Sequence, residues 1–215
     1  IAEDIINKSP FVREAMADNL INISALARMI LPEVEEIYGS EVKEGALIMA
    51  IKRMPPGPYY KINHKIKNFM SVLGDFIVRS DLQEFTYKNS ETFASKNSTV
   101  MQTITSDTST FYASCRSINE TTIITNSKVS KDIINGFKEE SLLTQVQELS
   151  AVTIILPPNN TEIIGVYYYI LKQIAWNGIN VRHVVSTTNE LTIIVDSESI
   201  DHVFSILMRI KKGKL

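Results

Sequence analysis

The segment VTIIL, Val152 to Leu156, and the turn PPNN that follows it at 157–160 decide how the last third of the chain folds. A run of β-branched and aliphatic residues before two prolines predicts a strand that ends in a turn. The apolar-rich segment from Ile163 to Trp176 is long enough for a helix, and Gly178 predicts its end. A buried strand that leads into a helix therefore begins this part of the chain.

Two more strands and a second helix follow. Ile179 to Val185 and Leu191 to Val195 have strand composition, and the polar residues Ser186 to Asn189 predict a turn between them. Ile200 to Ile210 has the apolar spacing of an amphipathic helix. A ferredoxin-like unit needs one more strand, and only residues 211–215 remain. The sequence leaves three sources of that strand open: the preceding unit, a partner chain, or none.

The preceding stretch, 69–148, shows the same order of elements less clearly. Its predicted elements are strands at Phe76 to Val78 and Glu84 to Tyr87, a helix after Ser90, strands at Thr110 to Arg116 and Thr121 to Thr125, a helix at Val129 to Phe137, and a strand at Leu143 to Glu148. The repeated order predicts two ferredoxin-like (βαββαβ) units, 69–148 and 149–215. The repeat is one of pattern and not of sequence identity.

Residues 1–58 predict a small helical module. Ser9 precedes a proline and is a candidate N-cap, and either Asn22 or Ser24 is expected to cap a second helix. Gly39 is a typical helix stop, and a further helix is predicted from Glu41 to Met54. Several short helices are therefore expected in the first quarter of the chain.

Prolines break this module at two places. Pro32 is expected to end one helix or to open the next. The Pro-rich run 55–58 cannot continue a helix, so a linker is predicted at 59–68. The whole chain is therefore predicted to be α+β, with a helical module followed by two ferredoxin-like units.

The composition narrows the class of protein. The 215 residues carry a formal net charge of −2, so no general attraction to nucleic acid or membranes is expected. The single cysteine excludes an internal disulfide, and no apolar run reaches the roughly 20 residues of a membrane-spanning helix. The three histidines lack metal-ligand spacing and no G-x-G loop occurs, so no metal or cofactor is predicted. The N-terminus has no secretion signal, which makes the cytoplasm the expected location.

Four features of residues 149–211 carry a resemblance to a known family. The first strand is followed by a turn that ends in Gly165-Val166, and the first helix ends in Asn177-Gly178-Ile179-Asn180. A hydroxyl-rich hairpin follows at Ser186 to Leu191, and the next strand leads into the acidic helix start Val195 to Glu198. In this order and spacing the stretch resembles the ACT domains of aspartokinases. Residues 69–148 are then expected to be the first domain of a tandem ACT pair.

The resemblance implies a site for a small amino acid where the first loop of one domain meets a strand edge. The implied ligand residues are Asn159, Asn160, Ile163, Gly165 and Val166 on the loop, and Asn180, Val181, Ser186 and Thr187 on the strand. Gly165 allows a close approach, and backbone N–H groups at a helix start bind carboxylates. The same residues also suit turns and a hairpin that bind nothing.

By the same resemblance, the protein is expected to be a non-catalytic allosteric regulator of amino-acid metabolism, with an amino acid of the aspartate family as a candidate ligand. The chain is too short to hold an aspartokinase catalytic domain as well, so no enzyme activity is expected. Exposed strand edges commonly pair side by side, which predicts a homodimer. The alternative is a ligand-free dimerisation or interaction subunit for an amino-acid biosynthetic enzyme.

Residues 21–54 resemble the helix-turn-helix or winged-helix modules that are attached to ACT domains in predicted regulators of amino-acid metabolism. The basic residues that would contact phosphates are Lys52, Arg53, Lys61, Lys65 and Lys67. Residues 1–68 nevertheless carry nine acidic and nine basic side chains, whereas DNA-binding modules usually have an excess of positive charge. A ligand-controlled DNA-binding regulator and a protein-interaction module both remain open.

Overall fold

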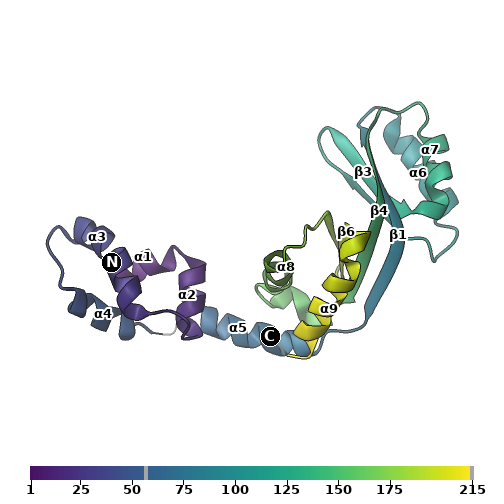
Figure 1. Ribbon diagram of the computed structural model, residues 1–215. Coiled ribbons are helices and arrows are strands. Elements are labelled where there is room, and N and C mark those ends of the chain that lie inside the picture. Colours follow the sequence, from purple (N-terminus) through teal and green to yellow (C-terminus); the bar gives the residue numbers. More distant parts are fainter. Residues whose placement is uncertain (56–57, 214–215) are drawn as a thin grey trace. The chain divides into compact units, whose positions relative to one another are not determined.

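The computed structural model describes residues 1–55 and 58–213, without the side chains of residues 58–61. Its contacts divide the chain into two compact units. One, the helical unit, comprises Ile1–Asn68 together with Ile163–Gly165. The other, the sheet unit, comprises Phe69–Glu162 and Val166–Leu215. Figure 1 shows the elements of both units along the chain.

The helical unit is built from short helices, of which the first four share one apolar core. They are α1 (Ala2–Asn7), α2 (Pro10–Ala17), α3 (Ile23–Tyr38), α4 (Glu44–Lys52) and the larger part of α5 (Pro58–Ser71). Ile6, Ala27 and Ile51, from three different helices, are buried in this core. Because no single short helix is stable alone in water, mutual burial of these faces holds the unit together.

The predicted helix ends are confirmed where the sequence has capping residues. Ser9 Oγ accepts a hydrogen bond from the backbone N–H of Val12 at 3.5 Å, at the start of α2. Asn22 Oδ1 accepts from the N–H groups of Ser24 and Ala25 at 3.0 and 3.1 Å. Gly39 ends α3 with a φ of 80°, which a residue with a side chain rarely adopts.

Two parts of the helical unit differ from the sequence interpretation. Pro32 lies inside α3 and neither ends nor opens a helix. Residues 59–68, predicted as a linker, lie within α5, because Ile66 and the residues on the same side of this stretch are buried at helical spacing. The described residues before Phe76 form helices and no strand, so they contain no wing. No described helix has both the length and the apolar character needed to cross a bilayer.

The sheet unit contains a six-stranded sheet in the order β2-β3-β1-β4-β6-β5. The strands are β1 (Phe76–Lys88), β2 (Tyr112–Arg116), β3 (Glu120–Asn126), β4 (Leu142–Ile155), β5 (His183–Ser186) and β6 (Glu190–Asp196). The helices are α6 (Phe93–Ile104), α7 (Ser130–Gly136), α8 (Val166–Trp176) and α9 (Ile200–Lys211), with short 3-10 turns at η1 (Ser127–Val129), η2 (Pro158–Glu162) and η3 (Ser197–Ser199). All neighbouring strands run antiparallel.

The two central strands, β1 and β4, pass through both ferredoxin-like units. Each is interrupted by one residue with positive φ, Asp81 at 58° and Glu148 at 57°, and their pairing shifts register there. Such irregularities bend a strand and increase its twist. We call the part of the sheet unit built on β1 after this bend and β4 before it the first half, and the rest the second half.

The last strand that the second half needs is supplied by residues 76–79, at the start of β1. Phe76 pairs with Ile154 and Arg79 with Ala151, so residues 76–79 lie beside β4 in the position that the ferredoxin-like order requires. The last strand of the first half is the beginning of β4, which pairs with the later part of β1. The two halves are therefore interlocked through shared strands, and an ACT-like ferredoxin fold is complete in each.

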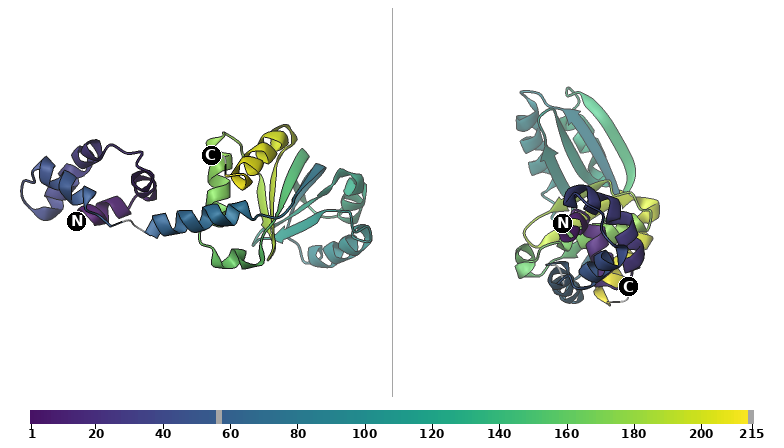
Figure 2. Two further views of the ribbon diagram at one scale, coloured as in Figure 1. Left: turned by 90° about the horizontal axis from the view of Figure 1, so that it is seen from below. Right: turned by 90° about the vertical axis from the view of Figure 1, so that its left-hand side faces the viewer.

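The helices of the two halves lie at opposite ends of the sheet unit, with α6 and α7 at one end and α8 and α9 at the other, as Figures 1 and 2 show. In the first half, α6 and α7 cover Phe85 and Ile123. In the second half, α8 and α9 bury Ile170 and Leu207. Along each strand, the residues that alternate with the helix-facing ones point to the other face of the sheet. On that face both halves contribute to a small apolar cluster around Leu149.

Candidate functional site

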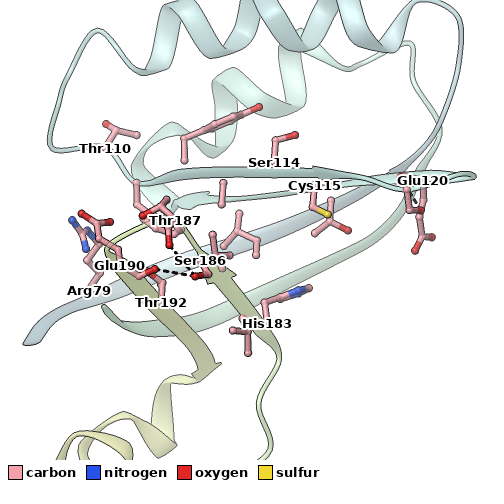
Figure 3. A pocket seen from close by; sticks show the side chains of 18 residues that line it. Arg79, Thr110, Ser114, Cys115, Glu120, His183, Ser186, Thr187, Glu190 and Thr192 are labelled. Carbon is pink, nitrogen blue, oxygen red and sulfur yellow. Dashed lines mark hydrogen bonds between the residues drawn. The ribbon is translucent and has the colours of Figure 1, made fainter. Parts of the chain in front are cut away.

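A groove lies on the helix-free face of the sheet, between β2–β3 of the first half and β5–β6 of the second. Its volume is about 780 Å³, and it is lined by both polar and apolar side chains (Figure 3). Ligand sites typically have volumes of this order. The bend at Asp81 and Glu148 creates the groove, because it brings together two strand pairs that would lie far apart in a flat sheet.

The two halves supply matching residues to the groove. Thr86 and Thr122 share a hydrogen bond of 2.9 Å in the first half, and Thr153 and Thr192 share one of 2.8 Å in the second. Thr122 and Thr192 both line the groove. The groove therefore has approximate two-fold symmetry in its backbone, and departures from that symmetry distinguish its two ends.

Arg79 is the strongest of these departures. The guanidinium Nη1 donates to Thr153 Oγ1 at 3.3 Å, and Cζ lies 5.6 Å from the centre of the Phe111 ring. Arg79 is half-buried and lines the groove, and no ion pair joins it to a carboxylate within the part of the chain that the structure describes. The matching position of the first half, on β4 opposite Glu84, is Val146. Only one end of the groove thus carries this positive charge.

Polar groups that can form further hydrogen bonds lie at the same end of the groove. Figure 3 shows Thr110, Thr187 and Glu190 at the Arg79 end of the groove, with Glu120 at the other end. Thr110 Oγ1 is buried and has no hydrogen-bond partner among the described atoms. A buried hydroxyl without a partner is unfavourable, and a bound ligand can satisfy it.

A hydrogen bond between the two halves holds the walls of the groove together. His183 Nε2 on β5 lies 2.8 Å from Glu84 Oε2 on β1, and Thr86 Oγ1 donates to Glu84 Oε1 at 3.2 Å. The hydrogen bond from His183 holds the pKa of the Glu84 carboxyl below its usual value, against the opposing effect of burial. Because this pair is internally satisfied, it fixes the walls of the groove and leaves little capacity for a ligand.

Of the nine ligand residues predicted from the sequence, Ser186 and Thr187 line this groove and the other seven do not. Ser186 Oγ hydrogen-bonds with the hydroxyl of Tyr167 on α8. Asn160 is buried, and its amide donates to the carbonyls of Pro157 and Thr188 at 3.0 and 2.7 Å. Its side chain therefore fastens the loop to the neighbouring hairpin.

The remaining predicted ligand residues are spread over the loop and the segment before β5. Gly165 has a φ of 87°, and a Cβ atom there would lie 3.0 Å from Cδ1 of Ile66 in α5. The space beside Gly165 is therefore already filled by a methyl group. The other positions are distributed as follows: Val166 is buried, Ile163 and Val181 are half-buried, and Asn159 and Asn180 are exposed.

The corresponding loop of the first half is occupied by a carboxylate of the protein itself. Glu140 accepts from Ser90 Oγ at 2.6 Å and from Thr92 Oγ1 at 2.7 Å, at the start of α6. Lys96 Nζ lies 2.9 Å from the same carboxylate. These donors lower the pKa of Glu140 to about 2, Lys96 having the largest effect. The first half thus shows that a loop at this place in the fold can hold a carboxylate.

The basic residues predicted for nucleic-acid contact lie at two places in the helical unit. Lys52 and Arg53 are exposed at the end of α4, while Lys65 and Lys67 flank the buried Ile66 on two sides of α5. The side chain of Lys61 lies outside the described residues. Residues two apart on a helix point about 200° apart, so Lys65 and Lys67 extend from two different sides of α5.

Sequence reasoning missed the charged end of the groove. Arg79 directly follows the predicted strand Phe76 to Val78, but nothing in the sequence indicates which residues stand opposite it. Thr110 begins a predicted strand, and the sequence pattern assigns this residue no role in a site. No group of three or more His, Cys, Asp or Glu residues suited to a metal ion occurs in the described part of the chain.

Comparison with solved structures identifies the fold. Crystallised aspartokinase alpha and beta subunits give a TM-score of 0.53 at 9% identity, over 66% of this chain and 99% of that one. The ligand-free regulatory subunit of aspartate kinase from Thermus thermophilus gives 0.52 at 8% identity, over 65% of this chain and 99% of the subunit. Aspartokinase III of E. coli, solved with aspartate and ADP, gives 0.51 at 10% identity, over 65% of this chain and 33% of the enzyme.

The TM-scores establish a shared fold, and at identities this low the similarity extends to the fold alone. No protein-family model matches the sequence, and no curated protein matches it. The chain is therefore similar in architecture to regulatory parts of aspartokinases.

Proposed function

We propose that this chain is a non-catalytic regulator whose two ACT-like halves bind a small amino acid. The groove between the halves is the observation that carries the proposal, since its volume of about 780 Å³ accommodates an amino acid with room to spare. A ligand there contacts β2–β3 and β5–β6 together, so binding affects the relative stability of arrangements of the two halves. That is the physical requirement for an allosteric response.

The fold comparison supports this proposal. The aspartate kinase regulatory subunit of Thermus thermophilus is matched over 99% of its length by a part of this chain. A regulatory role without a catalytic domain is therefore compatible with this architecture.

The loop of the second half is the other place for a ligand. By the resemblance, its ligand residues are Asn159, Asn160, Ile163, Gly165 and Val166, together with Asn180 and Val181. The carboxylate held by the equivalent loop of the first half supports this location. Because Gly165 is packed against Ile66, a substitution there disturbs packing as well as binding, and Asn180 is the cleaner position to test.

Isothermal titration of the full chain with each of the twenty amino acids tests the function. We expect heat with at least one of them; heat with none would overturn the proposal. Ala113→Phe fills the groove, whereas Asn180→Ala removes a polar group from the loop segment. Loss of binding in Ala113→Phe alone would assign the ligand to the groove, and loss in Asn180→Ala alone would assign it to the loop.

We further infer a homodimer that pairs exposed sheet edges. The edge strands of the described sheet are β2 and β5, whose outer backbone groups are open to another strand. Light scattering coupled to size-exclusion chromatography gives the mass directly. A monomeric mass across the micromolar range would contradict this inference.

For the helical unit, a protein partner has more support than DNA. The exposed side of α4 presents Ala46, Met49 and Ala50, which cannot read base edges by hydrogen bonds. A pull-down that recovers an amino-acid biosynthetic enzyme, and loses it with Met49→Lys, would support this role. A gel shift with genomic fragments that is sensitive to Arg53→Ala would instead favour DNA binding.

A further inference from the structure

We propose that the Arg79 end of the groove is the receptor for the carboxylate of a small zwitterionic ligand whose side chain is uncharged and apolar. This inference rests on the proposed function, because it names the chemical class of the ligand. Arg79 takes the carboxylate, Glu190 takes the ammonium group, and the apolar floor of the groove takes the side chain.

The unpaired charge of Arg79 is the first argument. A guanidinium that is partly removed from water needs compensation, usually a carboxylate with which it forms two parallel hydrogen bonds. The half-buried Arg13 has one hydrogen bond to the carboxylate of Glu3, at 3.2 Å, and the exposed Arg182 has two to Asp196, at 3.0 and 3.3 Å. Arg79 has a hydroxyl and a ring instead. These two contacts orient the guanidinium while leaving most of its N–H groups free.

The neighbours of Arg79 suit the rest of an amino acid. The hydroxyl of Thr110 is buried without a partner and can donate to a carboxylate oxygen beside the guanidinium. Glu190 is exposed at the same end and provides the negative charge that an ammonium group requires (Figure 3). Positive and negative groups at one end recognise both charges of a zwitterion at once.

The side chain of the ligand is constrained by the apolar lining of the groove. Phe111, Ala113, Ile124 and Val185 line the groove and provide this apolar surface. Acidic ligands are disfavoured, because their second carboxylate would meet the carboxylates of Glu190 or Glu120 without a second free cation. We therefore expect leucine-like ligands to bind more tightly than aspartate.

The test compares two probes on the full chain by isothermal titration. L-leucine carries both charged groups, and 3-methylbutanoate carries the carboxylate and apolar tail alone. Arg79→Met keeps an apolar stem and removes the guanidinium. Arg116→Met is the matched control, because Arg116 lies on β2 but does not line the groove.

We expect Arg79→Met to weaken binding of both probes by roughly ten- to hundredfold, as loss of a charged hydrogen-bonding group does. Arg116→Met should bind as the unchanged protein does, and Glu190→Gln should weaken leucine but not 3-methylbutanoate. Leucine affinity that survives Arg79→Met would overturn the inference and leave the proposed function intact. Binding of 3-methylbutanoate at Arg79 with no response to any amino acid would contradict the proposed function and retain the carboxylate site. Absence of binding by both probes would overturn the inference.

Discussion

The two halves of the sheet unit share a pair of long strands but organise the start of their first helix differently. In the first half, the Glu140 carboxylate fills the loop before α6 and is bound by two hydroxyls and an ammonium group. In the second half, the loop before α8 is fastened by the amide of Asn160 to two backbone carbonyls. The same backbone frame therefore supports a carboxylate-binding loop in one half and a loop held by a neutral amide in the other.

The groove shows a second difference between the halves. The Thr–Thr hydrogen bonds match, but Arg79 of the second half stands where the first half has Val146. The internal repeat thus gives the groove a symmetric backbone. A single difference in side chain at matched positions makes one end of the groove positively charged and the other not. A ligand with two unlike ends can lie in such a groove in one orientation only.

The largest effect is expected from breaking the core of the first half. Phe137 is 1% exposed and stacks on Phe93 at 4.8 Å between ring centres. Phe137→Ala should lower the free energy of unfolding by about 3–5 kcal/mol. Because β1 and β4 belong to both halves, the backbone amides of β3 in the first half and of β6 in the second, followed by hydrogen exchange in urea, should lose protection at the same lower urea midpoint. Separate midpoints would show that the halves unfold independently. Phe204→Ala, at a 36% exposed position of the second half, should cost clearly less.

A smaller effect is expected from the close approach of α6 and α7. A Cβ atom on Gly136 would collide with Cγ2 of Val100, a branched and buried side chain that has little freedom to move. Gly136→Ala should therefore destabilise the protein by about 1–3 kcal/mol. The control is Gly45→Ala in α4, where nothing lies within 4 Å of the added atom. That change should stabilise the helix by up to about 1 kcal/mol, so effects of the same sign would contradict the explanation.

The Glu140 loop should make the first half sensitive to acid. Because the pKa of Glu140, about 2, lies below the ordinary value of 4.5, the ionised carboxylate stabilises the fold above pH 4.5 and loses this effect as the pH falls toward 2. Glu140→Gln should cost about 1 kcal/mol at pH 7, after allowance for solvent screening, and the difference from the unchanged protein should vanish at low pH. Urea denaturation at several pH values measures this. Glu139→Gln removes an exposed partner of the same lysine and should have little effect at any pH.

The smallest effect is expected at the surface of the second half. Arg182 Nε lies 3.0 Å from Asp196 Oδ1, and the two side chains are 41% and 35% exposed to solvent. Arg182→Ala should change stability by less than about 0.5 kcal/mol, and 1 M salt should remove the difference. A larger effect that persists in salt would mean that this pair holds β5 in place by geometry and not by charge.

Much of the fold was predictable because it depends on local pattern. Strand composition at Val152 to Leu156 and caps such as Ser9 and Asn22 act through neighbouring residues, and the structure has a strand over the first segment and a helix directly after each cap. The predictions failed where distant contacts override local preference. Pro32 is accommodated within α3, and the stretch predicted as a linker forms a helix because one side of it is buried.

The candidate site was predictable only in part, for the same reason. Ser186 and Thr187 follow from the hydroxyl-rich hairpin and do line the groove. Arg79 and Thr110 carry no local signature, because a strand residue is exposed, buried or functional according to what stands opposite it.

By itself, the sequence of this protein determined the order of its elements, the repeat of strand and helix, and the resemblance to ACT domains, since these depend on spacing along the chain. The tertiary structure alone decided which segment completes the second half and which residues meet in the groove. Residues 76–79 pair with β4, and Arg79 reaches the same groove as Glu190. The physical reason is that strand pairing and the bend at Asp81 and Glu148 join segments far apart in sequence, and such contacts leave no periodicity for the sequence to show.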